Sequence, residues 1–406
     1  MTGPTLREVF TDALGFDPSQ PDFRRNPYAH YARLRARSPV HRGSAGFWVV
    51  SAYDWCVEIL KDPRFGHPGR APVHTPDALL GGSVDQDNFL LFMNPPKHTR
   101  VRSSVREVFG PGFVTRLRPY VERQIARLLD AGLTDGEFDV IGSYAHPLSL
   151  STVCELLGVP DEARPKVMAA AQDFLAGIDP TFALTDERGA KRDAALAELD
   201  EYFGELLERK YAEPAEDLMS ALAAETEGKI DARELRGTCI LLFIAGHGTT
   251  TNLIGNGTLT LLRHPADRAR FLADPAVAVS GVEELLRFDA PSQLTVRTAL
   301  EDIELGPYSI GKHEQVLVLR GAANHDPARF EDPDVLHLAR PDNKHLAFGS
   351  GIHRCLGAPL ARLEGGLALR ELFTRAPELR LVSDELTYRD SLLIRGLNAL
   401  PVRAAA

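Results

Sequence analysis

The sequence has little cysteine, with only four residues in 406. None of them has the Cys-x-x-Cys spacing, so neither a zinc site nor a disulfide framework is indicated. The first 23 residues are charged and polar throughout and lack an apolar run that could serve as a signal or anchor segment. From these absences we expect a protein of the reducing cytoplasm with no membrane anchor.

An excess of positive charge is missing as well. The 46 lysines and arginines are outnumbered by 56 acidic residues, and the net charge of −10 argues against nucleic acid as a partner. With 44% hydrophobic and 25% charged residues, the composition is that of an ordinary globular protein. The length could fit two or three domains, but no linker or low-complexity segment divides the chain. We therefore expect residues 1–406 to form a single domain.

Helical periodicity covers most of the first 270 residues, and short β-prone runs follow Pro291. The pattern predicts a mainly α fold with a minor β portion. Residues 63–88 are rich in Pro, Gly and His and are expected to form a long ordered loop. The predicted helices are 27–37, 53–61 and 96–109, then a helical region to 270 with breaks near 110–112, 158–160 and 179–180; the predicted strands are 40–41 paired with 47–50, then 295–297, 315–319 and 379–382.

One predicted helix is unusually long. Asp231 and Glu234 form a capping-box pattern, and apolar residues continue without proline to about Leu262. About thirty residues at ~1.5 Å each give a helix of about 45 Å. Its middle, Ile244-Ala245-Gly246-His247-Gly248-Thr249-Thr250, combines glycines and β-branched residues that form helix poorly. The Thr249 hydroxyl can donate to the carbonyl of residue 245, which bends helices. The turn is either a kink in a buried helix or part of a ligand site.

Cys355 lies in the stretch Phe348-Gly349-Ser350-Gly351-Ile352-His353-Arg354-Cys355-Leu356-Gly357. An amphipathic run from Leu356 to Phe373 follows, so the sulfur is expected near a helix start, where backbone N–H groups and the helix dipole favour a thiolate. The glycines allow the backbone to approach the sulfur and its ligand closely. A buried structural cysteine is the alternative.

The pattern Phe-x-x-Gly-x-x-x-Cys-x-Gly resembles the haem-thiolate signature of the cytochrome P450 family, and every fixed position of that signature is filled. The resemblance implies the cytochrome P450 fold, with a triangular α-helical domain and a small β-rich region. It also implies haem b as cofactor, with Cys355 as the axial ligand of the iron and Phe348, Gly349 and Gly357 beside it. Thiolate ligation favours O–O cleavage.

The resemblance extends to residues that would bind the haem propionates. His98 and Arg102 stand at i and i+4 of a helix that begins at Pro96, a pattern that by itself also fits a solvated face. Arg297 and His353 match the other propionate-binding positions. Arginine suits this role because its planar fork meets carboxylates bidentately.

The middle of the long helix is similar to the family's Ala-Gly-x-acid-Thr pattern for oxygen activation. Ala245 and Thr249 match it, and the Thr249 hydroxyl would steady dioxygen and help to deliver protons. Gly248 occupies the position of the usual acid, which leaves the proton relay open. Water, another side chain, or a reaction with less controlled proton delivery could account for it. His247 lies about 100° round the helix and is a poor substitute.

Glu284 and Arg287, at i and i+3, could form a surface bridge. The resemblance implies instead that they lock the core behind the haem as a buried triad with Arg329.

The implied activity is a monooxygenase reaction that activates O2 and hydroxylates or otherwise oxidises a hydrophobic or aromatic small molecule of secondary metabolism. No reductase domain is expected in the chain, so electrons would come from a ferredoxin or flavodoxin with its NAD(P)H reductase. Such donor proteins are acidic, and arginines on the surface of this chain would bind them. The candidates are Arg100, Arg106, Arg354 and Arg362.

By the same resemblance the substrate pocket is apolar. Asp179, Arg188 and Arg395 are candidates to anchor a polar group of the substrate. The expected wall residues are Phe89, Leu90, Phe92, Ile244, Leu294, Thr295, Leu393 and Ile394.

Three other functions stay open. Phenol coupling, peroxygenation or another atypical oxidation is favoured by Gly248. A non-catalytic haem gas sensor would not need Thr249 on a weakened helix. A thiol hydrolase based on Cys355 lacks a convincing His/Asp arrangement.

Overall fold

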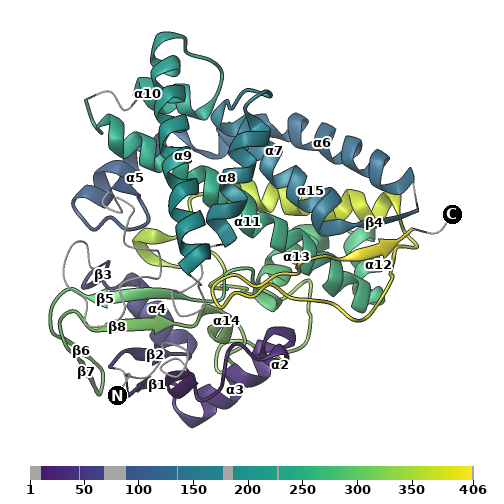
Figure 1. The fold of residues 1–406 in the computed structure, drawn as a ribbon. Coiled ribbons are helices and arrows are strands. Elements are labelled where there is room, and N and C mark those ends of the chain that lie inside the picture. The colour runs from purple at the N-terminus through teal and green to yellow at the C-terminus, as the bar shows by residue number, and fades with distance from the viewer. Residues whose placement is uncertain are drawn as a thin grey trace.

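The computed structural model describes residues 11–44, 46–67, 88–134, 136–176, 186–225 and 228–404. Helices form most of these residues, and the largest sheet lies to one side of the helical region (Figure 1). The predicted mainly α architecture with a minor β portion is confirmed.

Most predicted helix boundaries agree with the structure to within two residues. A π-helical turn, Val140–Ala145, precedes α7, and a 3₁₀ turn, Gly351–His353, precedes Cys355. The predicted break at 179–180 lies outside the described residues. The α-helices are α2 (Pro21–Arg25), α3 (Pro27–Arg37), α4 (Tyr53–Lys61), α5 (Lys97–Val108), α6 (Pro111–Thr134), α7 (His146–Leu157), α8 (Arg164–Ala176), α9 (Asp186–Ala212), α10 (Leu218–Glu225), α11 (Ala232–Arg263), α12 (Pro265–Ala273), α13 (Pro275–Phe288), α14 (Arg320–Ala323) and α15 (Ala358–Arg375).

The largest sheet has the order β1-β2-β8-β5-β3. Strands β2 and β8 are parallel, and the other neighbours are antiparallel. The predicted hairpin is confirmed, with Val40 opposite Val50. Most of the predicted loop 63–88 lies outside the described residues. The strands are β1 (Val40–Arg42), β2 (Trp48–Val50), β3 (Phe65–Gly66), β5 (Thr295–Ala299) and β8 (Gln315–Val318) in this sheet, β4 (Glu137–Asp139), β9 (Arg380–Leu381) and β10 (Pro401–Arg403) in a second, and β6 (Ile303–Leu305) and β7 (Tyr308–Ile310) in a third.

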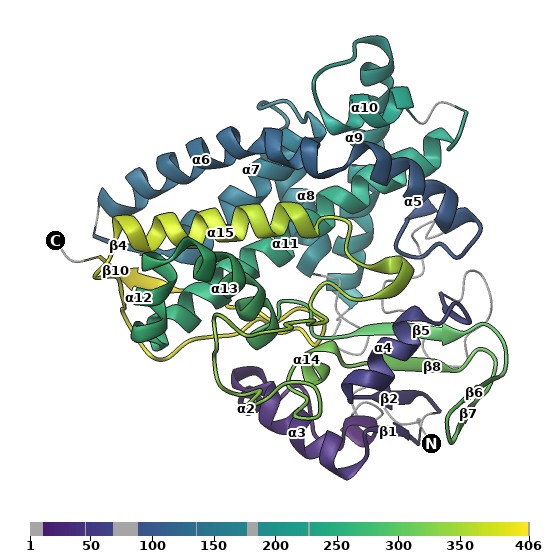
Figure 2. The same cartoon turned by 180° about the vertical axis from the view of Figure 1, so that it is seen from behind.

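Helix α11 is the long helix predicted from the sequence, and it has 32 residues. The Asp231 side chain accepts from the N–H of Glu234, and the Glu234 carboxylate accepts from the N–H of Asp231, so the capping box is formed. Helix α11 runs between α7, α9 and α15 (Figures 1 and 2). It therefore serves as the central support of the helical region.

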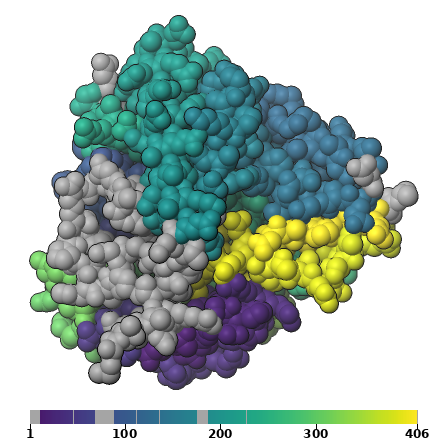
Figure 3. Space-filling model, viewed as in Figure 1, coloured from purple at the N-terminus to yellow at the C-terminus, as the bar shows by residue number. Residues whose placement is uncertain are grey.

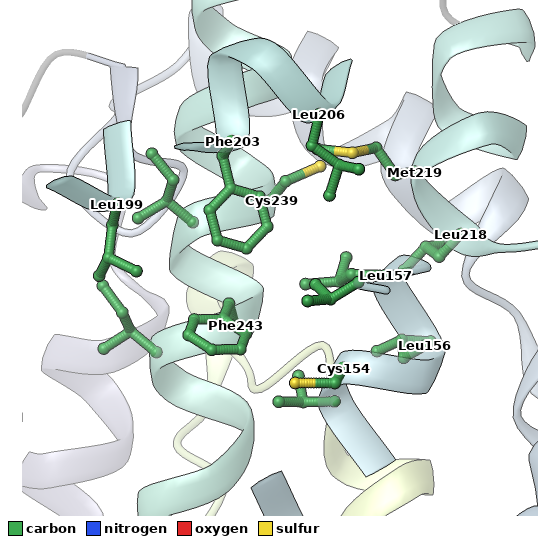
Figure 4. Close-up of a cluster of buried hydrophobic side chains, with 14 of the residues drawn as sticks. Cys154, Leu156, Leu157, Leu199, Phe203, Leu206, Leu218, Met219, Cys239 and Phe243 are labelled. Carbon is green, nitrogen blue, oxygen red and sulfur yellow. The ribbon is translucent and has the colours of Figure 1, made fainter. Parts of the chain in front are cut away.

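Two separate hydrophobic cores pack on α11. In the first core, residues of α11 up to Ile244 pack against α7, α9 and α10 (Figure 4). Its members include Phe203, Phe243 and Cys239. The second begins at Leu253 and joins α11 to α13 and α15. Residues 245–252 contribute no side chain to either hydrophobic core, although His247, Thr250, Thr251 and Asn252 are buried.

The N-terminal helices lie directly beside the C-terminal segment (Figure 3). Arg395 connects them, because its guanidinium donates to the carbonyls of Arg24 and Arg25 and is paired with Asp289. The hypothesis that Arg395 anchors substrate is therefore wrong. Its charge and hydrogen bonds hold these segments together.

No helix in the described ranges has the length and the apolar character that a membrane crossing requires.

Candidate functional site

A cavity of about 600 Å³ lies between the middle of α11, the Cys355 loop, β5 and the segment before β10. Its walls are mostly apolar. Of the candidate polar anchors Arg188 lines it, whereas Asp179 lies outside the described residues. All eight residues predicted for the substrate pocket line the cavity: Phe89, Leu90, Phe92, Ile244, Leu294, Thr295, Leu393 and Ile394.

The loop that carries Cys355 depends on glycine. Gly349 and Gly351 both have φ of 69°, in the left-handed region. A Cβ on Gly351 would lie 2.0 Å from the carbonyl oxygen of Leu60, so any side chain there would collide with α4. The N–H of Cys355 donates to the carbonyl of Phe348 at 2.8 Å and closes the loop. The backbone is thereby fixed next to the sulfur.

Cys355 immediately precedes the turn into α15, as predicted, and its sulfur is accessible from the cavity. The thiol lies deep inside the molecule, at the wall of the cavity, and this burial raises its pKa. The backbone N–H groups of Gly357 and Ala358 and the cations Arg320 and Arg102 oppose this effect and lower the pKa. The site thus supplies several groups that stabilise negative charge on this sulfur.

A cluster of cationic and histidine side chains lies around the same end of the cavity. Burial, and then repulsion from neighbouring cations, lowers the pKa of His353 to about 2 and that of His98 to about 4. Burial and then repulsion from Arg320 lower the pKa of Arg297 to about 10. Arg102 and Arg297 form no ion pair with a carboxylate in the described part of the chain. Bound anions would compensate the charges of the half-buried Arg102 and the buried Arg297.

Unpartnered polar atoms point to the same conclusion. Both ring nitrogens of His98 and Nε2 of His353 are buried without a hydrogen-bond partner among the described residues. The two rings lie 4.3 Å apart between centroids, although His98 does not itself line the cavity. Buried polar atoms in proteins are nearly always satisfied. These nitrogens are therefore suited to a ligand that accepts hydrogen bonds.

Two residues of this cluster were missed in the sequence. His67 follows β3, and its Nε2 lies 3.5 Å from the Arg297 guanidinium. Arg320 follows four consecutive apolar residues, Val316 to Leu319, and lines the cavity. A charged residue directly after a buried strand is a signal that could have been noticed. His67 lies within the predicted loop and has no comparable signal.

The middle of α11 forms one wall of the cavity, which Ala245, Gly248 and Thr249 all line. The Thr249 hydroxyl donates to the carbonyl of Ala245 at 3.1 Å, as predicted. The Asn252 amide donates to the carbonyl of Gly248 at 2.9 Å. This turn therefore presents the hydroxyl group of Thr249 to the cavity. At position 248 it has a glycine and thus no side chain there.

His247 does not take part in this wall. It is fully buried, its Nδ1 lies 3.0 Å from the carbonyl of Phe243, and its ring packs edge-on against His146. Burial lowers its pKa to about 4, so it is neutral near pH 7. It does not line the cavity, and it cannot replace the acid missing at Gly248.

The buried charge network behind the cavity differs from the prediction in one partner. Glu284 and Arg287 are fully buried and paired at 2.8 Å, but the third member is Arg340, whose Nε lies 3.1 Å from the Glu284 carboxylate. Arg329 instead pairs with Asp342 near the surface. The prediction for Arg329 is wrong because its backbone lies in the turn closed on residue 326, which directs the side chain over the ring of Tyr53.

The arginines proposed to receive an electron donor fall into two groups. Arg100 is bound to Glu234 at 2.7 Å, and Arg362 is bound to Glu283 at 2.6 Å. Arg106 and Arg354 are exposed. The charges of the first group are partly compensated within the protein.

Comparisons with known proteins agree with this geometry. Residues 278–375 match the family profile described as Cytochrome P450. The chain is 38% identical over 394 residues to 6-deoxyerythronolide B hydroxylase of Saccharopolyspora erythraea, covering 93% of this chain and 95% of that protein. It is 40% identical over 392 residues to Vitamin D(3) 25-hydroxylase of Pseudonocardia autotrophica, covering 94% of each. The structure of cytochrome P450 PksS from Bacillus subtilis superposes with a TM-score of 0.88 at 33% identity, covering 96% of this chain and 100% of that one.

The chain belongs to the cytochrome P450 family. It is therefore an oxidoreductase of the monooxygenase type, and its cofactor is haem b.

The residues present fit this cofactor. The arginines without an ion-pair partner and the unpartnered histidine nitrogens could form ion pairs and hydrogen bonds with the two propionate carboxylates. The accessible sulfur of Cys355 and the glycine backbone beside it match a planar ligand that approaches the loop closely. When bound, haem b supplies the redox-active iron at which dioxygen is activated.

Proposed function

We propose that this chain is a haem-thiolate monooxygenase that oxidises a hydrophobic small molecule held in the cavity. In this proposal Cys355 is the axial ligand of the iron. One observation carries the proposal: the accessible sulfur of Cys355, the uncompensated cations and the middle of α11 all face a single cavity. A thiolate, an anion-binding cluster and an oxygen-binding wall are the parts that this chemistry needs.

In this proposal four residues hold the haem propionates. His98 and Arg102 bind one carboxylate, and Arg297 and His353 bind the other. Phe348, Gly349 and Gly357 form the surface on which the macrocycle rests, and all three line the cavity. Burial, and then repulsion between these groups, lowers the pKa values of His353, His98 and Arg297. This supports the assignment, because two bound carboxylates would offset the repulsion.

Thr249, Ala245 and Gly248 would act on oxygen. The Thr249 hydroxyl holds its proton in the bond to the Ala245 carbonyl, and it must turn out of that bond to donate into the cavity. Gly248 has no side chain to pass protons onward. We propose that water beside Gly248 carries them, so that reduction is less tightly coupled to product formation than with an acid at this position.

The proposed substrate class follows from the wall residues. The side chains of Phe89, Leu90, Phe92 and Ile244 make a large apolar surface that favours a hydrophobic or aromatic molecule. The names of the relatives, a hydroxylase for 6-deoxyerythronolide B and one for vitamin D(3), support an intermediate of secondary metabolism or a similar lipid-like compound. The reaction would be a hydroxylation or a related oxidation.

We further propose that a ferredoxin or flavodoxin with its NAD(P)H reductase supplies the electrons, and that residues 1–406 work as a single domain in the cytoplasm. Arg106 and Arg354 are the better candidates for the docking surface, since both are exposed. A second function deserves testing because of Gly248: phenol coupling or a peroxide-driven oxidation needs less controlled proton delivery.

The carbon monoxide spectrum of the reduced protein tests the proposal. We expect a strongly red-shifted Soret band from the wild type, because the iron is bound by a thiolate, and no such band from Cys355→Ala. Cys239→Ala is the matched control, since that cysteine is buried in the first core and is not part of the cavity wall. A red-shifted band that persists in Cys355→Ala would refute the ligand assignment. Turnover with a surrogate ferredoxin and its reductase then tests the proposed oxidation of a hydrophobic small molecule.

A further inference from the structure

Helix α9 carries two arginines at the point where its buried face reaches the cavity. Further along this face, Leu196, Leu199 and Phe203 are buried in the first core, and the last two are labelled in Figure 4. Toward the start of the helix, the same face continues at steps of four residues to Arg192 and Arg188. Both arginines line the cavity. Charged residues on an otherwise apolar helix face are not explained by core packing.

Arg192 is the more deeply placed of the two, with 5% of its surface exposed. Its Nε and Nη2 contact a single oxygen, Oδ1 of Asp193, at 2.8 and 2.7 Å. This pair compensates charge on a buried cation, and a guanidinium has five N–H donors with which it can bind more than one acceptor. The half-buried Arg188 brings a second guanidinium to the same face. Two neighbouring guanidiniums are suited to bind one carboxylate.

The charges that line the cavity are predominantly positive. In the described part of the chain, the acid in its wall is Asp390, which is paired with Arg24. The proposed function assigns Arg102 and Arg297 to the propionates, and Arg320 lies near them, because it donates to the Leu294 carbonyl just before β5. The arginines of α9 come from a different element and form a second cationic group. The lining arginines are Arg102, Arg188, Arg192, Arg297, Arg320 and Arg389.

The wall around the two arginines of α9 is otherwise apolar. Helices α8 and α9 run side by side, and Lys166 of α8 lies 3.4 Å from Glu198 of α9. The end of α8 is therefore opposite the start of α9, and Phe174 near that end also lines the cavity. Leu241 and Leu242 continue the apolar wall along α11 toward its weak turn. These surroundings fit a molecule that is apolar except for one acidic end.

We infer that the substrate is a hydrophobic molecule with a carboxylate group, and that Arg188 and Arg192 bind this carboxylate. The inference rests on the proposed function and deepens it by naming the substrate class. Holding one end of the molecule at α9 limits which part of its apolar remainder reaches the wall that carries Thr249. Binding at this subsite makes and breaks no covalent bond.

Two other roles of these arginines lead to different expectations. If they only support the start of α9, their replacement should weaken the binding of acidic and neutral ligands to the same extent. If they contact the haem propionates, their replacement should accelerate the loss of haem. A loss of affinity that is confined to acids is expected only from a carboxylate subsite.

The experiment is equilibrium dialysis of the holoprotein at neutral pH with two acids and their methyl esters. Dodecanoic acid and 1-pyrenebutyric acid differ in shape, so the result does not depend on one type of hydrophobic group. We expect Arg192→Gln to weaken the binding of the acids at least tenfold, which is about 1.4 kcal/mol, and that of the esters less than about twofold.

Lys191→Gln is the matched control. It removes the same charge from the next position of α9, where the side chain is exposed and paired with Glu187 at 3.0 Å. Solvent and salt screen that site, so the affinities should not change. Arg188→Gln keeps the inference testable if Arg192→Gln does not fold, because Arg188 is only half-buried. It should weaken the same acids.

The outcomes separate the inference from the proposed function. The inference is overturned if neither acid binds to the wild type, if a folded variant loses acid and ester affinity equally, or if its haem transfers faster to apomyoglobin with no selective loss for acids. Dodecyl phosphate is a further probe, and a loss of affinity for this probe alone would overturn the carboxylate assignment. Dialysis does not depend on the ligand of the iron, whereas a wild type without the red-shifted carbon monoxide band would contradict the proposed function itself.

Discussion

Replacing Glu364 by glutamine should stabilise the protein at neutral pH. Glu364 lies on α15 with 1% of its surface exposed, facing the hydroxyl-bearing residues Ser149 and Thr152 of α7. One of its carboxylate oxygens has no hydrogen-bond partner among the described residues. Burial raises the pKa of this carboxyl from 4.5 to about 7, and the two hydroxyls offset only part of that rise. The folded protein therefore favours the protonated acid.

The sign and size of the effect follow from this pKa. Between pH 4.5 and about 7 the folded state holds the proton while the unfolded chain has released it. Stability therefore falls as the pH rises through this interval and is level above it. A difference of roughly 2.5 pKa units corresponds to about 3 kcal/mol of unfolding free energy. Glu364→Gln has the same shape and no charge, so it avoids this cost.

The assay is urea unfolding of wild type and Glu364→Gln between pH 4.5 and 8 at equal haem loading. The stability of the variant relative to the wild type should increase by up to about 3 kcal/mol across this range. The other titrating groups are common to both proteins and cancel in the difference. Glu122→Gln, in an exposed pair on α6, is the control and should show almost no pH-dependent difference. A flat difference for Glu364→Gln would refute the reasoning.

Two further predictions concern residues near the cavity. Arg340→Ala should lower the free energy of unfolding by about 1.5–3 kcal/mol, because it removes one of the two guanidiniums that bind the buried Glu284 carboxylate and leaves Arg287 as the other. Arg329→Ala should cost less than about 1 kcal/mol, because its pair with Asp342 lies near the surface. Equal losses in denaturant titrations would contradict the reassignment of the third partner. Gly248→Glu should increase the amount of product formed per NAD(P)H consumed, because it restores an acid beside the oxygen-binding wall. An unchanged ratio, measured with one substrate and one electron donor, would show that proton delivery does not depend on this position.

Local signals in the sequence predicted the elements well. The bounds of α3 and α4 were correct to the residue, and the capping box of α11 was formed as expected, because caps and apolar periodicity depend on neighbours along the chain. The placement of Cys355 before a helix was likewise visible from its glycines and the amphipathic run behind it.

Features that depend on distant contacts could not be obtained in this way. Arg329 and Arg340 are both arginines near prolines, and only the path of the loop between them decides which one reaches Glu284. Arg395 looked like a ligand for substrate but has its acid in Asp289, far away in the sequence. The cavity wall was outlined by resemblance to a family, since its members come from segments that no periodicity connects.

The weak turn of α11 combines positions of two kinds. Gly248 and Thr249 line the cavity and belong to neither core, so a change there alters the surface that meets oxygen and substrate and removes no member of either core. His247, Thr250, Thr251 and Asn252 are buried, and a side chain on Gly246 would press against Val153 of the first core. Engineering of new chemistry in this turn should accordingly be confined to the positions that face the cavity.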